Sequence, residues 1–314
     1  MQIQLYDASG QDRTLTAKQL ASVKITHDHL LWVNATPEQV RKAKFPGFIA
    51  AALALAERDL SAVRIHDDFY CFSVPVAGVK VGAANGILNM IVGEDWLVTE
   101  GEGEAIDFTE FLGHDVGETM KGKLSGSTLA AALLTEHFNR LHHNVELIDR
   151  EVDRVEERVL VTQEGGNTLQ IMAVLRRQVS RLRELLAGYR PVIHALTRPD
   201  FLPEMTNDDR RHFLHLQSGF ERLEDEVVRV RETVVNSFDL YSTRVGQDTN
   251  RLLRTLTFVT IGTGMIGALA GIFGMNFKAT VFESGQRGFE VVSVIMAVIM
   301  VVTTAAALNS RRRP

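Results

Sequence analysis

Two long uncharged runs near the C-terminal end constrain this chain more than any other feature. Thr255–Phe277 has 23 residues, Val291–Ser310 has 20, and neither run contains Asp, Glu, Lys or Arg. A helix that crosses a bilayer needs about 20 predominantly apolar residues, so both runs are long enough. A pair of buried core helices is the alternative, but core helices of this length usually carry a polar face. The sequence therefore predicts a two-helix membrane hairpin.

Basic residues set the expected orientation of this hairpin. Arg251 and Arg254 precede the first run, and three consecutive arginines, residues 311–313, follow the second. The connection between the runs carries two basic and two acidic residues, which cancel: Lys278, Arg287, Glu283 and Glu290. Because positively charged flanks stay in the cytoplasm, we expect both outer flanks, and both termini, on the cytoplasmic side.

The composition of the whole chain excludes several classes of protein. Its 314 residues are 45% hydrophobic and 23% charged, which fits neither a chain made mostly of membrane helices nor a disordered one. The net charge of −5 argues against a nucleic-acid partner. The single cysteine, Cys71, rules out an intramolecular disulfide and a CxxC zinc site, and we expect it to be buried in a strand. The first residues show no basic and apolar signal-peptide pattern, so the N-terminal bulk should stay in the cytoplasm.

Residues 1–125 have the mixed pattern of an α/β domain. The expected strands are Ile3–Tyr6, Leu30–Val33, Val63–Val76 and Ile87–Val98, and the expected helices are Pro37–Lys44, Phe48–Arg58 and Asp107–Glu118. No glycine-rich phosphate loop follows a strand, and no HExxH or Ser/His/Asp pattern occurs. We therefore expect neither an enzyme nor a bound cofactor.

From residue 126 to 254 the apolar period becomes helical and predicts a stalk of three helices. The first has an apolar stripe at Leu134, Phe138, Leu141, Val145, Ile148, Val152, Val155 and Val159. The second, from about Thr168 to Thr197, has inward residues at Leu175, Val179, Leu182, Leu186, Tyr189 and Ile193. The third starts after Thr206, a plausible N-cap. Its apolar residues recur every seven positions, at Phe213, Phe220, Val227, Val234 and Tyr241. This narrow coiled-coil seam is expected to need other copies of the chain. No proline lies between Thr206 and Phe273, so the helix can continue into the membrane.

One face of the first membrane run is small or weakly polar and carries no charge. Steps of three and four residues give Asn250, Leu253, Thr257, Thr260, Gly264, Gly267 and Gly271, and the run ends at Gly274, Met275 and Asn276. Such a face can serve close helix packing. It can also form a pore wall for a hydrated cation, because Mg²⁺ gives up its waters reluctantly and a carboxylate would bind it too tightly for rapid passage. Two spans cannot enclose a water-filled path, so a pore requires several copies.

The segment Tyr241–Phe277, with the GMN signature at residues 274–276, resembles the pore helix of CorA-type divalent metal cation transporters. The resemblance covers almost the whole chain. It implies a homopentameric funnel, with an α+β cytoplasmic domain and a long helical stalk that continues into a two-helix transmembrane hairpin. It also implies location in the cytoplasmic (inner) membrane of a bacterium. The transported ions would be hydrated Mg²⁺, and also Co²⁺ or Ni²⁺, which are candidate regulators as well.

The same resemblance implies roles for individual residues. Gly274, Met275 and Asn276 correspond to the selective entrance. Gly271 corresponds to a backbone-carbonyl site one turn inside. Asn250 and Leu253 correspond to a polar and a hydrophobic gate at the cytoplasmic edge.

Some features depart from the magnesium members. Gly264 and Gly267 stand where relatives often have Met and Thr, and the loop lacks their proline–glutamate pair. Val174–Leu186 and Leu202–Arg211 look more like the ZntB branch, which is associated with zinc. A ZntB-like Zn²⁺ transporter, with or without proton coupling, is therefore an open alternative. A membrane-anchored coiled-coil scaffold is the alternative from a different class.

Two further clusters have both a metal-binding and a structural interpretation. His212 and His215 lie three residues apart on the expected third stalk helix, where they could share a zinc ion or be solvated. The acidic run from Glu146 to Glu157 alternates with arginines. It fits a solvated helix face with i,i+4 pairs, or a cation sensor between subunits.

The expected organisation has six parts. They are a cytoplasmic α/β domain at 1–125, a stalk at 126–254, the first span at 255–277, an external loop at 278–290, the second span at 291–310 and a basic cytoplasmic tail at 311–314. The expected partners are the lipid membrane, divalent cations and further copies of the chain.

Overall fold

A computed structural model describes residues 1–58, 62–76, 86–101, 125–161, 168–198, 200–201, 206–275 and 285–312. The chain divides into two compact units, Met1–Arg158 with Gln163–Asn236, and Val159–Thr162 with Ser237–Pro314. The helix expected at Asp107–Glu118 and the signature residue Asn276 lie outside the described residues.

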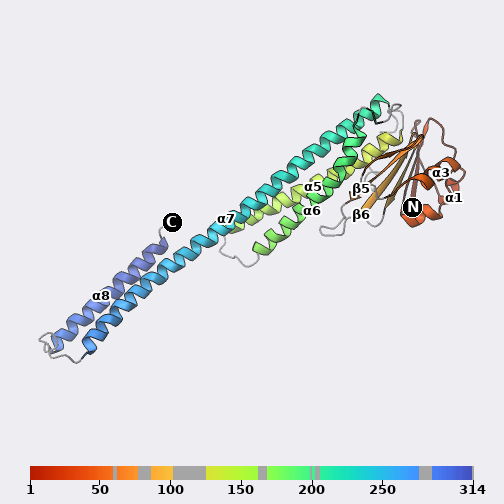
Figure 1. Cartoon of the computed structure of the whole chain (residues 1–314). Coiled ribbons are helices and arrows are strands. Elements are labelled where there is room, and N and C mark those ends of the chain that lie inside the picture. Colours follow the sequence, from red (N-terminus) through yellow and green to blue (C-terminus); the bar gives the residue numbers. More distant parts are fainter. Residues whose placement is uncertain are drawn as a thin grey trace. The chain divides into compact units, whose positions relative to one another are not determined.

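The first unit contains a seven-stranded sheet (Figure 1). Its strands are β1 (Gln2–Asp7), β2 (Arg13–Thr14), β3 (His29–Ala35), β4 (Arg64–Ile65), β5 (Phe69–Val76), β6 (Gly86–Gly93) and β7 (Trp96–Gly101). They follow the order β2-β1-β3-β7-β6-β5-β4, and among the described strands β3 and β7 form the parallel pair. Two expected strands are each divided. Val63–Val76 holds β4 and β5, and Ile87–Val98 covers most of β6 and the start of β7, with each pair antiparallel.

Helices cover both faces of this sheet. One face packs in a buried cluster with α1 (Ala17–Leu20), α2 (Pro37–Lys42) and α3 (Gly47–Leu55). The cluster includes Ile3 and Cys71, so the cysteine is buried in a strand as expected. On the other face α6 packs against β5. Gly188 of α6 lies so close to Pro75 that an added Cβ would stand 2.7 Å from the proline Cγ. Glycine at this position therefore lets the helix approach the sheet.

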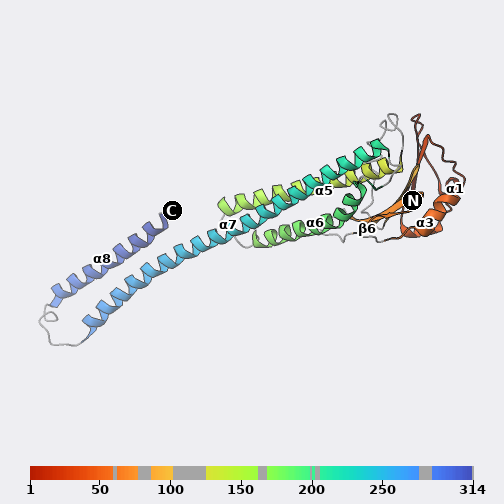
Figure 2. The same cartoon turned by 45° about the horizontal axis from the view of Figure 1, so that its top comes forward.

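Three long helices complete the first unit. They are α5 (Gly126–Val161), α6 (Thr168–Leu196) and the N-terminal part of α7 (Asn207–Gly274), and they lie side by side in both views (Figures 1 and 2). Phe138 of α5 meets Tyr189 of α6 edge-on, with ring centroids 5.1 Å apart, and meets Phe220 of α7 at 5.6 Å. The expected α5 stripe is buried along its length. On α6 the inward set is confirmed except for Leu182, which is half-buried while Leu185 is buried.

The heptad seam of α7 is filled within a single chain. Its residues are at most 4% exposed: Phe213, Leu216, Phe220, Leu223, Val227, Val230 and Val234. The expectation that this seam needs other copies is therefore wrong. The period identifies the buried face correctly, but α5 and α6 of the same chain supply the partners. Tyr241, the last residue of the expected seam, is half-buried.

A buried carboxylate joins the start of α5 to the start of α7. Asp209, which is 6% exposed, accepts hydrogen bonds from the hydroxyls of Thr128 at 2.7 Å, Thr206 at 2.6 Å and Ser125. Thr206 also accepts the backbone N–H of Asp209 at 3.1 Å, which confirms its N-cap role. From there α7 continues as one helix of 68 residues, as the absence of proline predicts.

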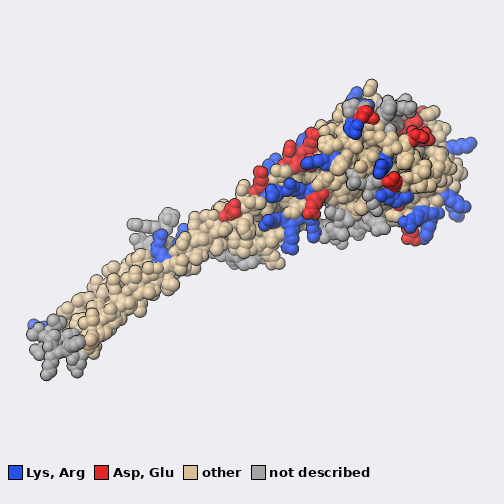
Figure 3. All heavy atoms as spheres, in the orientation of Figure 1, with Lys and Arg blue, Asp and Glu red and all other residues tan. Residues whose placement is uncertain are grey.

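The second unit is an antiparallel pair made by the C-terminal part of α7 and by α8 (Gly285–Arg312). Both helices are long and apolar enough to cross a membrane. Only 6% of the most apolar stretch of α7 and 0% of that of α8 is buried, which argues against two soluble core helices. Figure 3 shows few charged side chains on the visible face of this part, whereas many lie on the first unit. Helix α8 already begins at Gly285, inside the segment 278–290 assigned to the loop.

Candidate cation pathway

Gly262 of α7 lies in close contact with Thr303 of α8. It is buried, and a Cβ added there would stand 2.7 Å from Oγ1 of Thr303 and 3.0 Å from its Cβ and Cγ2. Neighbouring residues of α7 on the same face, such as Ile266, are half-buried. The face of α7 that packs within the chain is therefore centred on Gly262.

The predicted pore face lies on the opposite side of α7. At about 100° per residue, its positions from Asn250 to Gly271 fall between about 140° and 240° from Gly262 around the helix axis. All of them are exposed in the single chain: Asn250, Leu253, Thr257, Thr260, Gly264, Gly267 and Gly271. A Cβ at any of the three glycines would meet nothing within 4 Å. Within one chain, the small residues of this face therefore do not serve the packing of α7 on α8.

The threonines of the predicted pore face present acceptor oxygens. The hydroxyl of Thr257 donates to the Leu253 carbonyl at 2.9 Å, and that of Thr260 donates to the Leu256 carbonyl at 2.8 Å. Each hydroxyl proton is thereby used by the helix, and the lone pairs of the oxygen stay free. Waters bound to a cation direct their hydrogens outward, so an acceptor surface suits a hydrated cation.

The two ends of the predicted pore face are partly described. Helix α7 ends at Gly274, and the backbone N–H of Met275 donates to the Ile272 carbonyl at 3.2 Å. At the other end Leu253 is 54% exposed, and Asn250 is exposed one turn before it. Between them Arg251 pairs with Asp248 at 3.7 Å. The entrance and gate roles of these residues stay predictions.

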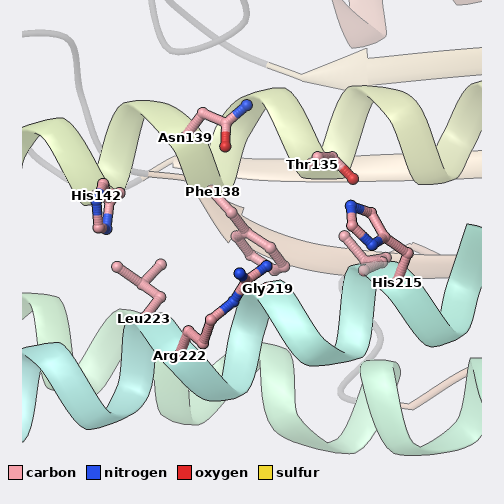
Figure 4. Close-up of a pocket in the computed structure, with 9 residues that line it drawn as sticks. Thr135, Phe138, Asn139, His142, His215, Gly219, Arg222 and Leu223 are labelled. Atoms are coloured by element: carbon pink, nitrogen blue, oxygen red, sulfur yellow. The ribbon is translucent and has the colours of Figure 1, made fainter.

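The two histidines of α7, His212 and His215, make different contacts. His212 Nδ1 lies 2.8 Å from the Asp208 carbonyl of its own helix, whereas His215 lines a cavity of about 270 Å³ between α5 and α7. Figure 4 shows His215 and His142 toward opposite ends of this cavity, with the Arg222 side chain between them. Across the described residues, no group of three or more His, Cys, Asp or Glu side chains is placed to hold a metal ion.

The acidic run of α5 forms several local ion pairs. Glu146 pairs with Arg150 at 3.1 Å, and Glu151 pairs with Arg154 at 2.9 Å. These exposed pairs support the interpretation of a solvated helix face.

The fold and the two apolar helices define an integral membrane protein with a C-terminal two-helix hairpin. The family model described as "CorA-like Mg2+ transporter protein" matches residues 46–308. The chain therefore belongs to the CorA-like Mg²⁺ transporter family, as the GMN signature and its surroundings predict.

Two curated relatives are named as cobalt/magnesium transport protein CorA. The Thermotoga maritima protein is 30% identical over 175 residues, which is 56% of this chain and 48% of that protein, so the match spans about half of the relative's length. The Methanocaldococcus jannaschii protein is 22% identical over 94% of this chain and 95% of its own length.

Solved structures show the same fold. The complete CorA magnesium transporter of M. jannaschii has a TM-score of 0.74 at 19% identity and covers 98% of this chain and 97% of its own. A full-length CmaX protein has a TM-score of 0.73 at 18% identity, with 99% and 97% covered. The ZntB cytoplasmic domain from Vibrio parahaemolyticus has a TM-score of 0.57 at 11% identity, with 78% and 98% covered.

Sequence reasoning missed the residues that join α7 to α8, namely Gly262 and Thr303. A signal was present, because Gly262 and Gly264 are two residues apart and lie about 200° apart on a helix. At most one of them can belong to a given face. The sequence does not say which glycine meets α8.

Proposed function

We propose that this chain transports divalent metal cations across a membrane, along a path lined by the exposed face of α7. The observation that carries the proposal is the separation of two glycine faces. Gly262 meets α8, while Gly264, Gly267 and Gly271 lie on the far side with open space around them. Family membership supports the same function.

The transporting form is a homopentamer in the cytoplasmic membrane of a bacterium. Two spans per chain cannot enclose a pore, so copies must surround an axis and turn this face of α7 toward it. Both termini lie in the cytoplasm, because Arg251 and Arg254 precede the first span and arginines follow the second. The proposal includes the division of the chain into a cytoplasmic α/β domain, a stalk, a first span, an external loop, a second span and a basic cytoplasmic tail.

Gly274, Met275 and Asn276 form the outer entrance, where the cation is selected as a hydrated ion. Gly271 offers its carbonyl one turn inside, and the hydroxyl oxygens of Thr257 and Thr260 continue the acceptor surface. At the cytoplasmic edge Asn250 supplies a polar stop, and a ring of Leu253 side chains excludes water until the helices move apart.

The preferred cation is Mg²⁺, with Co²⁺ and Ni²⁺ also carried. The names of the family and of both curated relatives support magnesium and cobalt. The relation to the ZntB fold rests on 11% identity and carries no argument for zinc. Zn²⁺ transport is therefore the alternative that the experiment includes.

Flux into liposomes tests the function. Purified full-length protein is reconstituted, and entry of Mg²⁺, Co²⁺, Ni²⁺ and Zn²⁺ is followed with and without a pH gradient. We expect Mg²⁺ entry that Co²⁺ inhibits and that does not require the pH gradient. Zinc entry driven by the gradient would favour the ZntB-like alternative. No flux of any cation from assembled protein would refute transport and favour the membrane-anchored scaffold.

A further inference from the structure

A groove runs between α7 and α8 beside the Gly262–Thr303 contact. Its volume is about 300 Å³, and it is lined by Thr255, Val259, Gly262, Thr263, Ile266, Met300, Thr303, Thr304 and Ala307. The hydroxyls of Thr255, Thr263 and Thr303 all donate to carbonyls of their own helices. Their hydroxyl protons are thereby used within each helix, and Val259, Ile266, Met300 and Ala307 make most of the remaining lining apolar.

The length and position of the groove match one leaflet of a bilayer. From Thr255 to Ile266 it follows eleven steps of α7, or about 16 Å at 1.5 Å per residue. Half of the roughly 30 Å hydrocarbon core is about 15 Å. The groove starts where the first apolar run starts and ends near its middle.

Positive charge lies next to the start of the groove. Arg251 is one turn before Thr255, and at about 100° per residue it falls on the same face of α7 as Gly262. Its one described ion pair is the 3.7 Å contact with Asp248. Arg254 is exposed and forms no ion pair with a described residue. The sequence at and just beyond the C-terminal end of α8 adds the arginines of 311–313.

From these observations we infer that the groove holds an acyl chain of an anionic phospholipid from the cytoplasmic leaflet, with its phosphate at Arg251. Along α7 the arginine comes first and the apolar groove follows, just as the charged headgroup of such a lipid precedes its acyl chain on the way into the bilayer. A gap between helices at this depth has no water to fill it, and an empty one would lose dispersion contacts on both helices. Charge complementarity selects an anionic lipid over a zwitterionic one. The inference rests on the proposed membrane hairpin.

Quenching of tryptophan by brominated lipid tests this site. Met300→Trp places a reporter at the rim of the groove, where Met300 is 57% exposed. Val302→Trp is the control, because Val302 is 59% exposed and does not line the groove. Each full-length variant is reconstituted in phosphatidylcholine with a few mole per cent of brominated phosphatidylglycerol. We expect clearly stronger quenching at position 300 than at position 302.

Two substitutions connect that signal to the site. In the Met300→Trp background, Thr304→Leu should remove the excess quenching by filling the groove. Arg251→Gln should weaken the preference for phosphatidylglycerol about fivefold, the effect of one basic residue near the surface. Arg244→Gln makes the same charge change about 10 Å nearer the N-terminal end of α7, away from the groove. It should have little effect on the preference for phosphatidylglycerol.

Equal quenching at positions 300 and 302 would overturn the inference, because it would show bulk lipid alone. Quenching at 302 without any at 300 would also overturn it, because another copy of the chain would then cover the groove. A bilayer made entirely of brominated lipid should quench any tryptophan that faces acyl chains. Quenching there distinguishes absence of the groove site from absence of the membrane hairpin. If Val302→Trp is not quenched there, the membrane hairpin itself is wrong.

Discussion

Alanine substitutions at Gly262 and Gly264 should separate the packing face of α7 from the proposed pore face. The two glycines lie in the same helix two residues apart, so replacing either one by alanine gives a similar gain in helix propensity. That gain is about 1 kcal/mol at an exposed position. The surroundings differ, because Gly262 meets Thr303 and Gly264 meets nothing within 4 Å.

The cost at Gly262 follows from the three short distances. A Cβ there would stand 2.7 Å from Oγ1 of Thr303 and 3.0 Å from its Cβ and Cγ2. Thr303 cannot turn away easily, because its hydroxyl donates to the Ile299 carbonyl at 2.8 Å and β-branched side chains are stiff in helices. Overpacking of this kind costs about 1–3 kcal/mol. Because the propensity gain is similar at both glycines, the two variants should differ in stability by about 1–3 kcal/mol.

Unfolding in mixed detergent micelles and cation flux in liposomes should give opposite patterns. Gly262→Ala should lower the free energy of unfolding, and Thr303→Ala should restore part of the loss in the double variant. Gly264→Ala should keep or raise stability but reduce flux per assembled protein, because each copy adds a methyl group to the path. If Gly264→Ala instead destabilises the protein as much as Gly262→Ala, the face that we assign to the pore is a packing surface.

Four further predictions concern single positions. Asp209→Ala should cost about 2–4 kcal/mol of unfolding free energy, because a buried carboxylate with three hydroxyl donors is lost. The exposed Asp208→Ala should cost less than about 1 kcal/mol. Burial lowers the pKa of His137 to about 4, below its usual 6.5, so its protonation should destabilise the folded state as pH falls from 6.5 toward 4, by up to about 3 kcal/mol. His137→Phe should flatten that part of the stability–pH curve. Asn276→Ala should abolish or strongly reduce cation uptake while assembly is kept, and wild-type flux would refute the entrance. Leu253→Asn should raise basal flux without changing which cations compete, and lower thermal stability with unchanged flux would place the gate elsewhere.

The sequence identified buried faces well but not the elements that cover them. The α7 period from Phe213 to Val234 picked out residues that are all buried. Its seven-residue spacing suggested contact with another copy, yet α5 and α6 of the same chain fill it. Periodicity reports that a face is apolar, and it carries no information on which helix supplies the opposite side.

Strand boundaries failed where both faces of a strand are buried. Successive residues of a strand point to opposite faces of the sheet, yet nearly all of them are buried from Phe69 to Val76 and across most of β6 and β7. The run Ile87–Val98 therefore reads as one strand, although the turn at Glu94 and Asp95 divides it. Polar residues mark turns clearly only when the flanking strands alternate.

The position of α8 also limits how copies of the chain can assemble. Because the proposed pore face lies opposite Gly262, any ring that turns this face toward its axis must place α8 on the outer side of α7. The exposed apolar residues of α8, such as Val301 at 67% and Val302 at 59%, then face lipid or a neighbouring copy rather than the ion. A conservative change such as Val301→Leu should leave flux and cation selection unchanged, whereas a methyl group added at Gly264 should not. Equal sensitivity of flux at the two positions would mean that α8 also lines the path, and the single-helix pore wall would be wrong.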